Sequence, residues 1–391
     1  MALACAVCLI GAFSAPNAVA ESLPPQGTFE NCGLDMELQT CLQRLQVMHG
    51  GGVQVVVIPA WGVSLSSLST YADTAHALGM SVMWETAGGG PYWWQGTPAS
   101  TSMAAWFPGF ASECGCNQNG PLLAYTIQWL SQLPGTYGYY AADDSMLSAG
   151  DQAALAQYVA QIKQQDPNHT VMISSAGESQ TTEYQQIPDV IGTEMYPVTT
   201  DSLMPVGANQ DMWDSIAQWA NDAQQSADSA GKQSAFILQA FTWGDNLGDG
   251  EAIGACSPSD TPASCAAKLR YPNSSEQLQL RNEALSHAHP KLIIWYSFYA
   301  TYGAASGSGP ADPAAATRWS GLAEAIQAPF PASPGALQSP HVSTNTSRAA
   351  TPHRPRAHTA RHKRRRHHHR RQKVRHHAKR HHARRHHAKP G

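Results

Sequence analysis

The chain has 391 residues, of which 42% are hydrophobic, enough for one large α/β domain or two ordinary domains with a sizeable core. Its formal net charge of −3 conceals an asymmetry, because 17 of the 25 Lys and Arg residues lie between Arg348 and Gly391, where there is no Asp or Glu. The rest of the chain is strongly acidic, which argues against an anionic polysaccharide as its substrate, since approach would be repulsive at low salt.

The first 20 residues have the length and apolar character of a signal peptide and end in Ala18-Val19-Ala20, a small-x-small cleavage pattern. The segment lacks the usual positive charge at its start, and the alternative is a buried N-terminal strand. No later segment reaches the roughly 18 apolar residues that a membrane span needs. We therefore expect a secreted or cell-surface protein with no transmembrane span, whose globular part begins at residue 21.

Six cysteines follow this segment, an even number that favours disulfides in an exported chain. They are Cys32, Cys41, Cys114, Cys116, Cys256 and Cys265. The first two and the last two are close in sequence, and pairing within each is the simplest prediction. The middle two could form a tight bridge or a pair of thiols for a metal, but no His or second Cys pair stands at zinc-site spacing nearby. We therefore expect no metal and no cofactor.

Short β-branched runs alternate with amphipathic helical stretches along the chain. Strands are predicted at 27–32, 53–59, 81–86, 138–144, 169–175, 190–196, 235–241 and 292–297. Helices are predicted at 38–48, 68–78, 122–133, 152–165, 212–227, 276–287 and 314–326. Such regular alternation favours a parallel sheet with helical crossovers.

Eight such units over 21–328 favour a (β/α)8 TIM barrel, with a doubly wound open sheet as the alternative. No Gly-rich dinucleotide fingerprint follows the first strand. Residues 329–351 form a Pro/Ser/Ala/Thr-rich linker, and residues 352–391 form a His/Arg/Lys-rich tail that we expect to be disordered, because it has almost no aliphatic residues.

Carboxylates and aromatic rings recur where the predicted strands end. Because the C-terminal strand ends of a barrel meet at one rim, these side chains should converge there. Aromatic rings stack on sugar faces, and carboxylates perform acid, base or nucleophile chemistry on glycosidic bonds. The ends carry Trp61, Glu85 with Trp93 and Trp94 beyond it, Asp143 with Asp144, Glu194 with Tyr196, Gln239 with Trp243 and Asp245, and Trp295 with Tyr296.

Several of these stretches resemble the barrel members of the glycoside hydrolase superfamily. The first, GYYAADD, is similar to the G-[WY]-Y-x-x-D-E signature at the fourth strand of many such hydrolases. The stretches are GYYAADD at 138–144, DVIGTEMYPV at 189–198, ILQAFTW at 237–243 and IIWYSFY at 293–299. The resemblance covers residues 27–326 and implies a secreted hydrolase acting on a poly- or oligosaccharide.

The resemblance implies a catalytic carboxylate at Asp144, where relatives commonly have Glu. The largest group of retaining barrel glycosidases has a Glu nucleophile on strand seven, whereas this chain has Gln239, which cannot attack. The available partner is Glu194, and a pair on strands four and six is similar to that of retaining α-galactosidase-like barrels. Our hypothesis is that Asp144 attacks the anomeric carbon or activates water while Glu194 protonates the leaving oxygen, and the carboxyl separation decides between retention and inversion.

The other strand-end residues are expected to bind or orient the substrate. Asp143 alternates to the strand face opposite Asp144 and is predicted to be an orienting or structural group. Glu85 and Asp245 are substitutes for the second carboxylate. Hydroxyl binding is expected of Tyr196, Gln239 and Tyr296, and stacking of Trp61, Trp93, Trp94, Trp243 and Trp295.

Two further interpretations stay open at this point. The barrel could be a carbohydrate-binding protein without catalysis, held at a surface by its polycationic tail. The tail could instead be the working part, as a metal or polyanion binder. As partners we expect a carbohydrate and, for the tail, an anionic cell-wall or surface polymer. No specific nucleic acid is expected, because no aromatic residues alternate with the basic ones to stack on bases.

Overall fold

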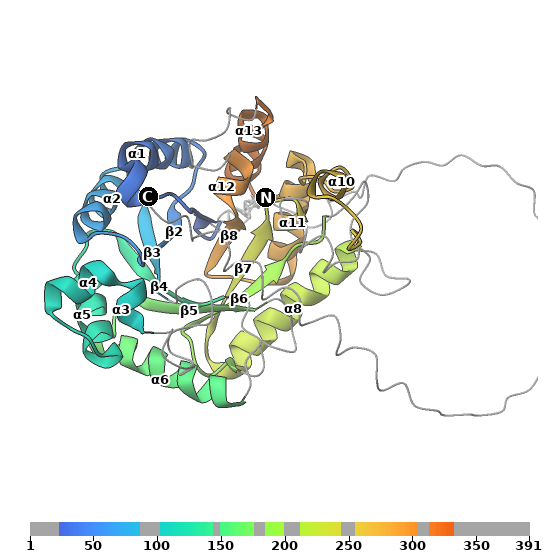
Figure 1. The fold of residues 1–391 in the computed structure, drawn as a ribbon. Coiled ribbons are helices and arrows are strands. Elements are labelled where there is room, and N and C mark those ends of the chain that lie inside the picture. Colours follow the sequence, from blue (N-terminus) through green and yellow to red (C-terminus); the bar gives the residue numbers. More distant parts are fainter. Residues whose placement is uncertain are drawn as a thin grey trace, which may run out of the picture.

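The structure is a computed structural model, shown in Figure 1, and it is a closed barrel of eight parallel strands in the order β1 to β8. It describes residues 23–86, 102–143, 149–175, 184–198, 212–243, 255–302 and 313–331. Strand β8 pairs with β1, so the sheet has no edges and the prediction of a (β/α)8 barrel is confirmed against an open sheet. The predicted signal peptide, linker and basic tail lie outside the described residues.

All eight predicted strands are present, each within a few residues of its expected bounds. They are β1 (Gln26–Phe29), β2 (Val55–Pro59), β3 (Ser81–Glu85), β4 (Thr136–Ala142), β5 (Thr170–Ser175), β6 (Val190–Met195), β7 (Gln233–Gln239) and β8 (Leu292–Tyr296). Their β-branched composition suits strands that are covered on both faces, as parallel strands in a barrel are.

The seven predicted helices are also present and form a ring outside the strands (Figure 1). They are α1 (Leu34–Gly50), α2 (Leu65–Ala77), α5 (Asn119–Ser131), α6 (Ala149–Gln165), α8 (Met212–Ala230), α11 (Ser274–His287) and α13 (Pro313–Gln327). Among the described residues, four short helices were not predicted, because a helix of four to seven residues has too few turns to show a period. They are α3 (Met103–Trp106), α4 (Pro108–Cys114), α10 (Pro262–Ala266) and α12 (Phe298–Tyr302).

Polar side chains mark where two of the outer helices begin. The Ser64 hydroxyl accepts the backbone N–H of Ser67 at the start of α2. Asn273 and Glu276 form a reciprocal capping box at the start of α11, in which each side chain accepts the other residue's backbone N–H. Such caps satisfy amide groups that the first helical turn leaves without partners.

Two apolar layers follow from the alternation of side chains along the strands. The inner layer takes alternate residues from all eight strands and none from the helices: Phe29, Val55, Val57, Met83, Tyr140, Met172, Val190, Ala235, Ile237, Leu292 and Ile294. The residues between them, such as Trp84 and Trp295, pack outward against the helices. The inner layer therefore closes the barrel interior below the rim where the strands end.

Strand β4 departs from strict alternation near its C-terminal end. Tyr140 pairs with Met172 on β5, but the next β5 residue pairs with Ala142, so β4 has one extra residue there. Both Ala141 and Ala142 consequently belong to the outer layer. Such a bulge reverses which faces the following side chains point to.

Gly138 is required earlier in β4, where the backbone lies against β5. A Cβ atom at this position would collide with the carbonyl oxygen of Thr170. The glycine of the GYYAADD stretch therefore has a packing reason that is independent of any chemistry.

Three disulfides are present. The predicted pairs Cys32–Cys41 and Cys256–Cys265 are confirmed. Of the two alternatives for the middle cysteines, the structure has the bridge between Cys114 and Cys116. Within the described residues, no helix combines the length and the apolarity needed to cross a membrane.

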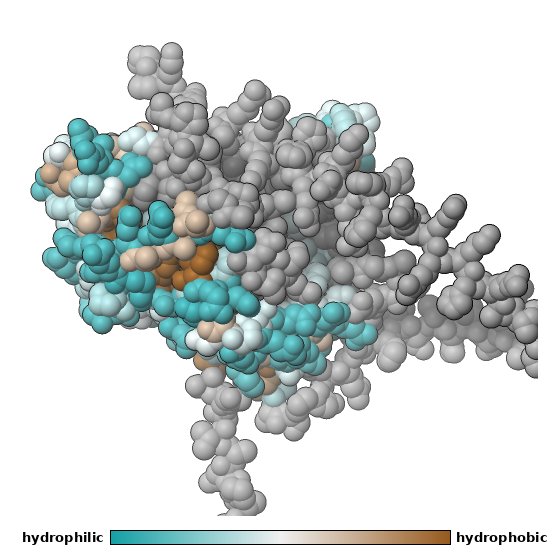
Figure 2. Space-filling model, turned by 90° about the horizontal axis from the view of Figure 1, so that it is seen from below, coloured by the Kyte–Doolittle hydropathy of each residue, from teal (hydrophilic) through white to brown (hydrophobic). Residues whose placement is uncertain are grey.

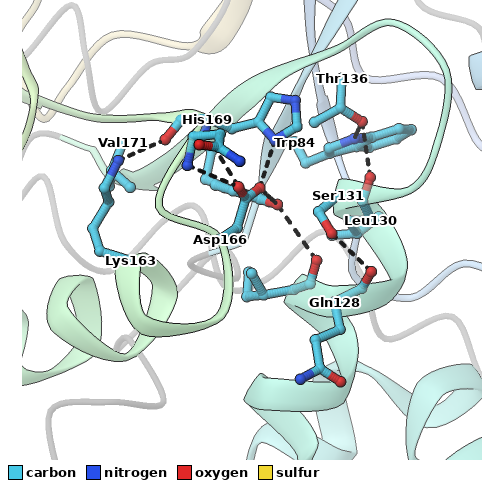
Figure 3. A network of polar contacts seen from close by, with 12 residues as sticks. Trp84, Gln128, Leu130, Ser131, Thr136, Lys163, Asp166, His169 and Val171 are labelled. Atoms are coloured by element: carbon cyan, nitrogen blue, oxygen red, sulfur yellow. Dashed lines mark hydrogen bonds and ion pairs between the residues drawn. The ribbon is translucent and has the colours of Figure 1, made fainter.

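A polar network closes the turn between α6 and β5, at the barrel end opposite the C-terminal strand ends (Figure 3). The Asp166 carboxylate is buried and accepts the Tyr139 hydroxyl at 2.7 Å and pairs with the His169 ring at 2.5 Å. Burial alone would raise the pKa of Asp166, but these hydrogen bonds hold it below its ordinary value. At this end of a barrel such contacts serve stability.

The described part of the surface is mostly hydrophilic in the view of Figure 2, with one small apolar area. Among the described residues, Met36 is the one large hydrophobic side chain with a mainly exposed surface. On the face seen in this view, the exposed apolar surface of the described residues is therefore confined to that one area.

Candidate active site

Alternation brings a set of polar and aromatic side chains from successive strands to the interior rim. Each continues the inward-facing series of its strand beyond the apolar layer, and so points toward the barrel axis. They are Glu85 on β3, Ser174 on β5, Glu194 on β6, Gln239 on β7 and Tyr296 on β8. The site is therefore a consequence of strand register, with one residue contributed by each of five strands.

The Asp143 and Glu194 carboxylates share one hydroxyl group. Ser174 Oγ lies 2.9 Å from Asp143 Oδ1 and 3.0 Å from Glu194 Oε1. Because both contacts meet at the same atom, the two carboxylate oxygens are at most about 6 Å apart. Tyr140 donates its hydroxyl to Asp143 Oδ1 at 2.5 Å and also contacts Ser174 Oγ at 2.5 Å. Asp143 and Glu194 are both only partly buried.

Asp143 lies on the interior side of the rim, and its predicted role as an orienting or structural group stays a prediction. Strict alternation from inward-facing Tyr140 would point Asp143 outward. The extra residue in β4 removes one step of that alternation, and the Asp143 carboxylate bonds to Tyr140 and Ser174 inside the rim. Asp144, the predicted catalytic residue, lies outside the described residues.

Glu85 is the third carboxyl group of the rim. Burial and then the negative charge of Asp143 raise the pKa of Glu85 to about 7, while a hydrogen bond from the Trp61 side chain acts in the opposite direction. Near neutral pH this group therefore exists in both protonation states. A carboxyl group with such a pKa suits general acid or base chemistry at neutral pH.

We expect Glu85 to make the stability of the protein depend on pH. Because its pKa is raised in the folded state, its stabilising effect is complete below the unfolded value and is lost as pH rises through about 7. Glu85→Gln cannot ionise, so relative to the natural chain it should gain about 3 kcal/mol of unfolding free energy between pH 5 and pH 9.

Urea unfolding of both proteins across this range measures the difference. Asp143→Asn provides the control, because removing the neighbouring charge should move the midpoint of the effect to lower pH. Parallel stability curves for the natural chain and Glu85→Gln would contradict the raised pKa.

An aromatic cluster lines the opposite part of the mouth. The Tyr196 ring lies 5.0 Å from Phe241, 6.0 Å from Trp243 and 5.9 Å from Tyr296, measured between ring centroids. Tyr299 donates its hydroxyl to the Tyr296 hydroxyl at 2.8 Å. The Tyr296 pKa is raised well above its ordinary value, first by burial, so its hydroxyl stays protonated. Such rings can cover the apolar face of a sugar, and their hydroxyls can bind its oxygens.

Two predicted binding residues are engaged elsewhere. The Gln239 amide accepts the backbone N–H of Val198 and donates to the carbonyls of Val198 and Phe241, and it is fully buried. This side chain holds the segment after β6 in place. Trp295 is also fully buried, on the helix side of β8, with its indole N–H donated to Gln26. The structure therefore does not bring Trp295 to the rim, because it alternates with Tyr296.

The remaining predicted residues fall into two groups. Trp61 lies beside Glu85 at the mouth and packs edge-on against Trp106 on α3. Trp93, Trp94 and Asp245 lie outside the described residues. Within the described ranges, no group of three or more His, Cys, Asp and Glu side chains is arranged to hold a metal ion.

The sequence analysis missed Tyr140, Ser174, Phe241 and Tyr299. Tyr140 and Ser174 lie within their strands, where an inward-facing polar residue cannot be told from a core residue by its position at a strand end. Counting two residues onward from each inward-facing apolar residue would have found Ser174, because Met172 precedes it.

The fold and the rim define a (β/α)8-barrel protein with a site of carboxylates and aromatic rings. No protein-family model and no curated protein matches the chain.

Among solved structures the chain is similar to an endo-β-1,4-mannanase from Thermotoga petrophila, with 10% identity over 78% of each chain and a TM-score of 0.45. It is also similar to an endo-1,4-β-mannanase from Eisenia fetida, with 12% identity over 79% of this chain and 92% of that one and a TM-score of 0.44. A GH2 β-galacturonidase from Eisenbergiella tayi has 13% identity over 77% of this chain and 50% of that one, with a TM-score of 0.47. At this level of similarity the function has to be inferred from the site.

Proposed function

We propose that the protein is a secreted glycoside hydrolase that acts on a poly- or oligosaccharide. The observation that supports the proposal is that Ser174 bonds both to Glu194 and to Asp143, the residue before Asp144, so that Glu194 and the C-terminal end of β4 lie together in a mouth lined by aromatic rings. Two carboxyl groups on either side of one bond are what glycoside hydrolysis requires. A protein that only binds sugar has no need of them.

In this proposal Glu194 protonates the leaving oxygen, and an aspartate at the end of β4 attacks the anomeric carbon or activates water. The sequence resemblance assigns that aspartate to Asp144. The position of Glu194 on the interior rim supports its part of the assignment. The other proposed substrate contacts are Trp61, Glu85, Trp93, Trp94, Asp143, Tyr196, Trp243, Asp245 and Tyr296.

Secretion and attachment belong to the same proposal. Three disulfides are typical of proteins that fold in an oxidising compartment, which agrees with export. The basic tail would hold the enzyme at an anionic cell-wall or surface polymer, while the acidic barrel acts on a neutral glycan.

The test is release of reducing ends from a panel of neutral polysaccharides by the full chain, compared with Asp144→Asn and Asp143→Asn. We expect release from at least one substrate and a loss of about a thousandfold in the variant that lacks the attacking carboxylate. If Asp144→Asn keeps its activity and Asp143→Asn does not, the attacking residue is Asp143. Binding of one glycan with no release by any protein would favour the carbohydrate-binding alternative.

A further inference from the structure

Tyr140, Ser174, Asp143 and Glu194 make more contacts than their hydroxyl hydrogens can serve at one time. Tyr140 Oη contacts both Asp143 and Ser174, and Ser174 Oγ contacts both Asp143 and Glu194. Each hydroxyl has a single hydrogen to donate. Ser174 therefore donates to Asp143 or to Glu194, but never to both at once.

Because Ser174 and Tyr140 are buried, it matters which carboxylate receives the Ser174 hydrogen bond. Ser174 is fully buried and Tyr140 is 1% exposed, so bulk water does not replace a missing donor at these hydroxyls. In such surroundings a hydrogen bond to an ionised carboxylate is stronger than in water. The Ser174 hydrogen is accordingly drawn to whichever carboxylate has the greater negative charge.

We propose that Ser174 is a positioning residue that turns its hydrogen bond between Asp143 and Glu194 as Glu194 gains and loses its proton. The inference rests on the proposed function, in which Glu194 is the proton donor. Tyr140 allows Ser174 to change its acceptor, because the Tyr140 hydroxyl still donates to Asp143 when Ser174 donates to Glu194.

The reaction step balances as follows. Protonated Glu194 gives its proton to the glycosidic oxygen while the bond from that oxygen to the anomeric carbon breaks, and the attacking carboxylate or water bonds to that carbon. The leaving group departs as an alcohol, and Glu194 is left as a carboxylate. Ser174 then turns from Asp143 to Glu194 and stabilises the new charge. Where the β4 carboxylate has attacked, water then bonds to the anomeric carbon, the bond to that carboxylate breaks, and Glu194 takes the proton of that water. Where water attacks directly, its proton passes to the β4 carboxylate, and both carboxyl groups regain their starting protonation by exchange with solvent. Once Glu194 is protonated again, Ser174 returns to Asp143.

Three titratable groups of the described structure interact with Glu194 directly or across Ser174. Asp143 lies across Ser174, and the charge of Glu194 also acts on Tyr140 and Tyr296. Burial is the first cause that raises the pKa of both tyrosines well above its ordinary value, so they remain neutral near pH 7. The charge of Asp143 also acts on Glu85. The Ser174 hydroxyl, the Tyr140 hydroxyl and Asp143 are therefore among the groups that respond to a change of charge at Glu194.

The test is Ser174→Ala. Loss of a donor to ionised Glu194 should raise its pKa by about one pH unit, and the limb of the pH–rate profile that reports Glu194 should move equally. We expect kcat to fall about tenfold to a hundredfold with KM little changed. The carboxyl titration of Glu194 is followed by NMR in protein made with 13C-labelled glutamate, and Glu194→Gln identifies its resonance.

Ser234→Ala is the matched control. Ser234 is a buried serine at the start of β7 whose hydroxyl donates to Gln224 at 2.8 Å, at the barrel end away from the rim. Its removal should leave the Glu194 titration unchanged. If Ser174→Ala does not fold, Tyr140→Phe replaces it, because Ser174 would then be held by Asp143 and the Glu194 pKa should again rise.

An unchanged Glu194 titration in Ser174→Ala, or in Tyr140→Phe where that variant is used, overturns the proposal whatever happens to activity. If the Glu194 pKa rises in the variant but the natural chain hydrolyses no glycan, the exchange of the Ser174 hydrogen bond between Asp143 and Glu194 is supported and the proposed hydrolase function is rejected. The titration therefore separates failure of this inference from failure of the proposed function.

Discussion

Replacement of Glu194 by Gln is expected to lower kcat about a thousandfold or more while the protein remains folded. In the natural chain Ser174 donates a hydrogen bond of 3.0 Å to Glu194, and Gln has nearly the same shape and can still accept it. Gln cannot, however, release a proton to the leaving oxygen. The measurement is kcat on the best substrate of the panel, with circular dichroism to show that the fold is retained.

A substrate with an acidic phenol as leaving group sharpens this prediction. Such a group departs without protonation, so Glu194→Gln should lose much less activity on it. Glu283→Gln on α11 is the matched control, because Glu283 pairs with His287 on the outer surface of that helix and should not affect activity. Equal losses on both kinds of substrate would argue against Glu194 as the proton donor.

Replacement of Arg44 by Met is expected to lower the free energy of unfolding by about 3–5 kcal/mol. Arg44 on α1 forms two hydrogen bonds, of 2.8 and 3.0 Å, with the Glu30 carboxylate that follows β1. The Glu30 side chain has no exposed surface, and that of Arg44 is 6% exposed. Met keeps the apolar stem but leaves a buried carboxylate without its partner, which costs more than the pair itself contributes.

The loss of unfolding free energy in Arg44→Met should depend on pH. Burial raises the pKa of Glu30 and Arg44 opposes this, so the variant should raise that pKa further. Its loss of stability is therefore largest at high pH and shrinks as Glu30 becomes protonated at low pH. The measurement is urea unfolding at several pH values. The double variant Glu30→Gln with Arg44→Met removes the charge and should recover most of the stability, and failure to recover would show that packing of Arg44 against Phe298 dominates.

The order of elements could be predicted from the sequence because it depends on local signals. Strand-forming runs recur eight times and helical periods seven times, and cysteines nine residues apart form local disulfides. Glu85, Glu194 and Tyr296 could be placed at the rim for the same reason, since each ends or nearly ends a strand. These features need no knowledge of which residues meet across the barrel.

Residue roles at the rim depended on contacts between strands. A single extra residue in β4 turned Asp143 inward, and this depends on how β4 pairs with β5 between Tyr140 and Ala142. Gln239 is occupied by the backbone of Val198, 41 positions away, and Trp295 faces helices rather than the mouth. The sequence alone therefore determined the barrel and the chemical groups at its strand ends, because periodicity is local. Only the tertiary structure decided which of those groups share a hydrogen bond, because that depends on register between strands.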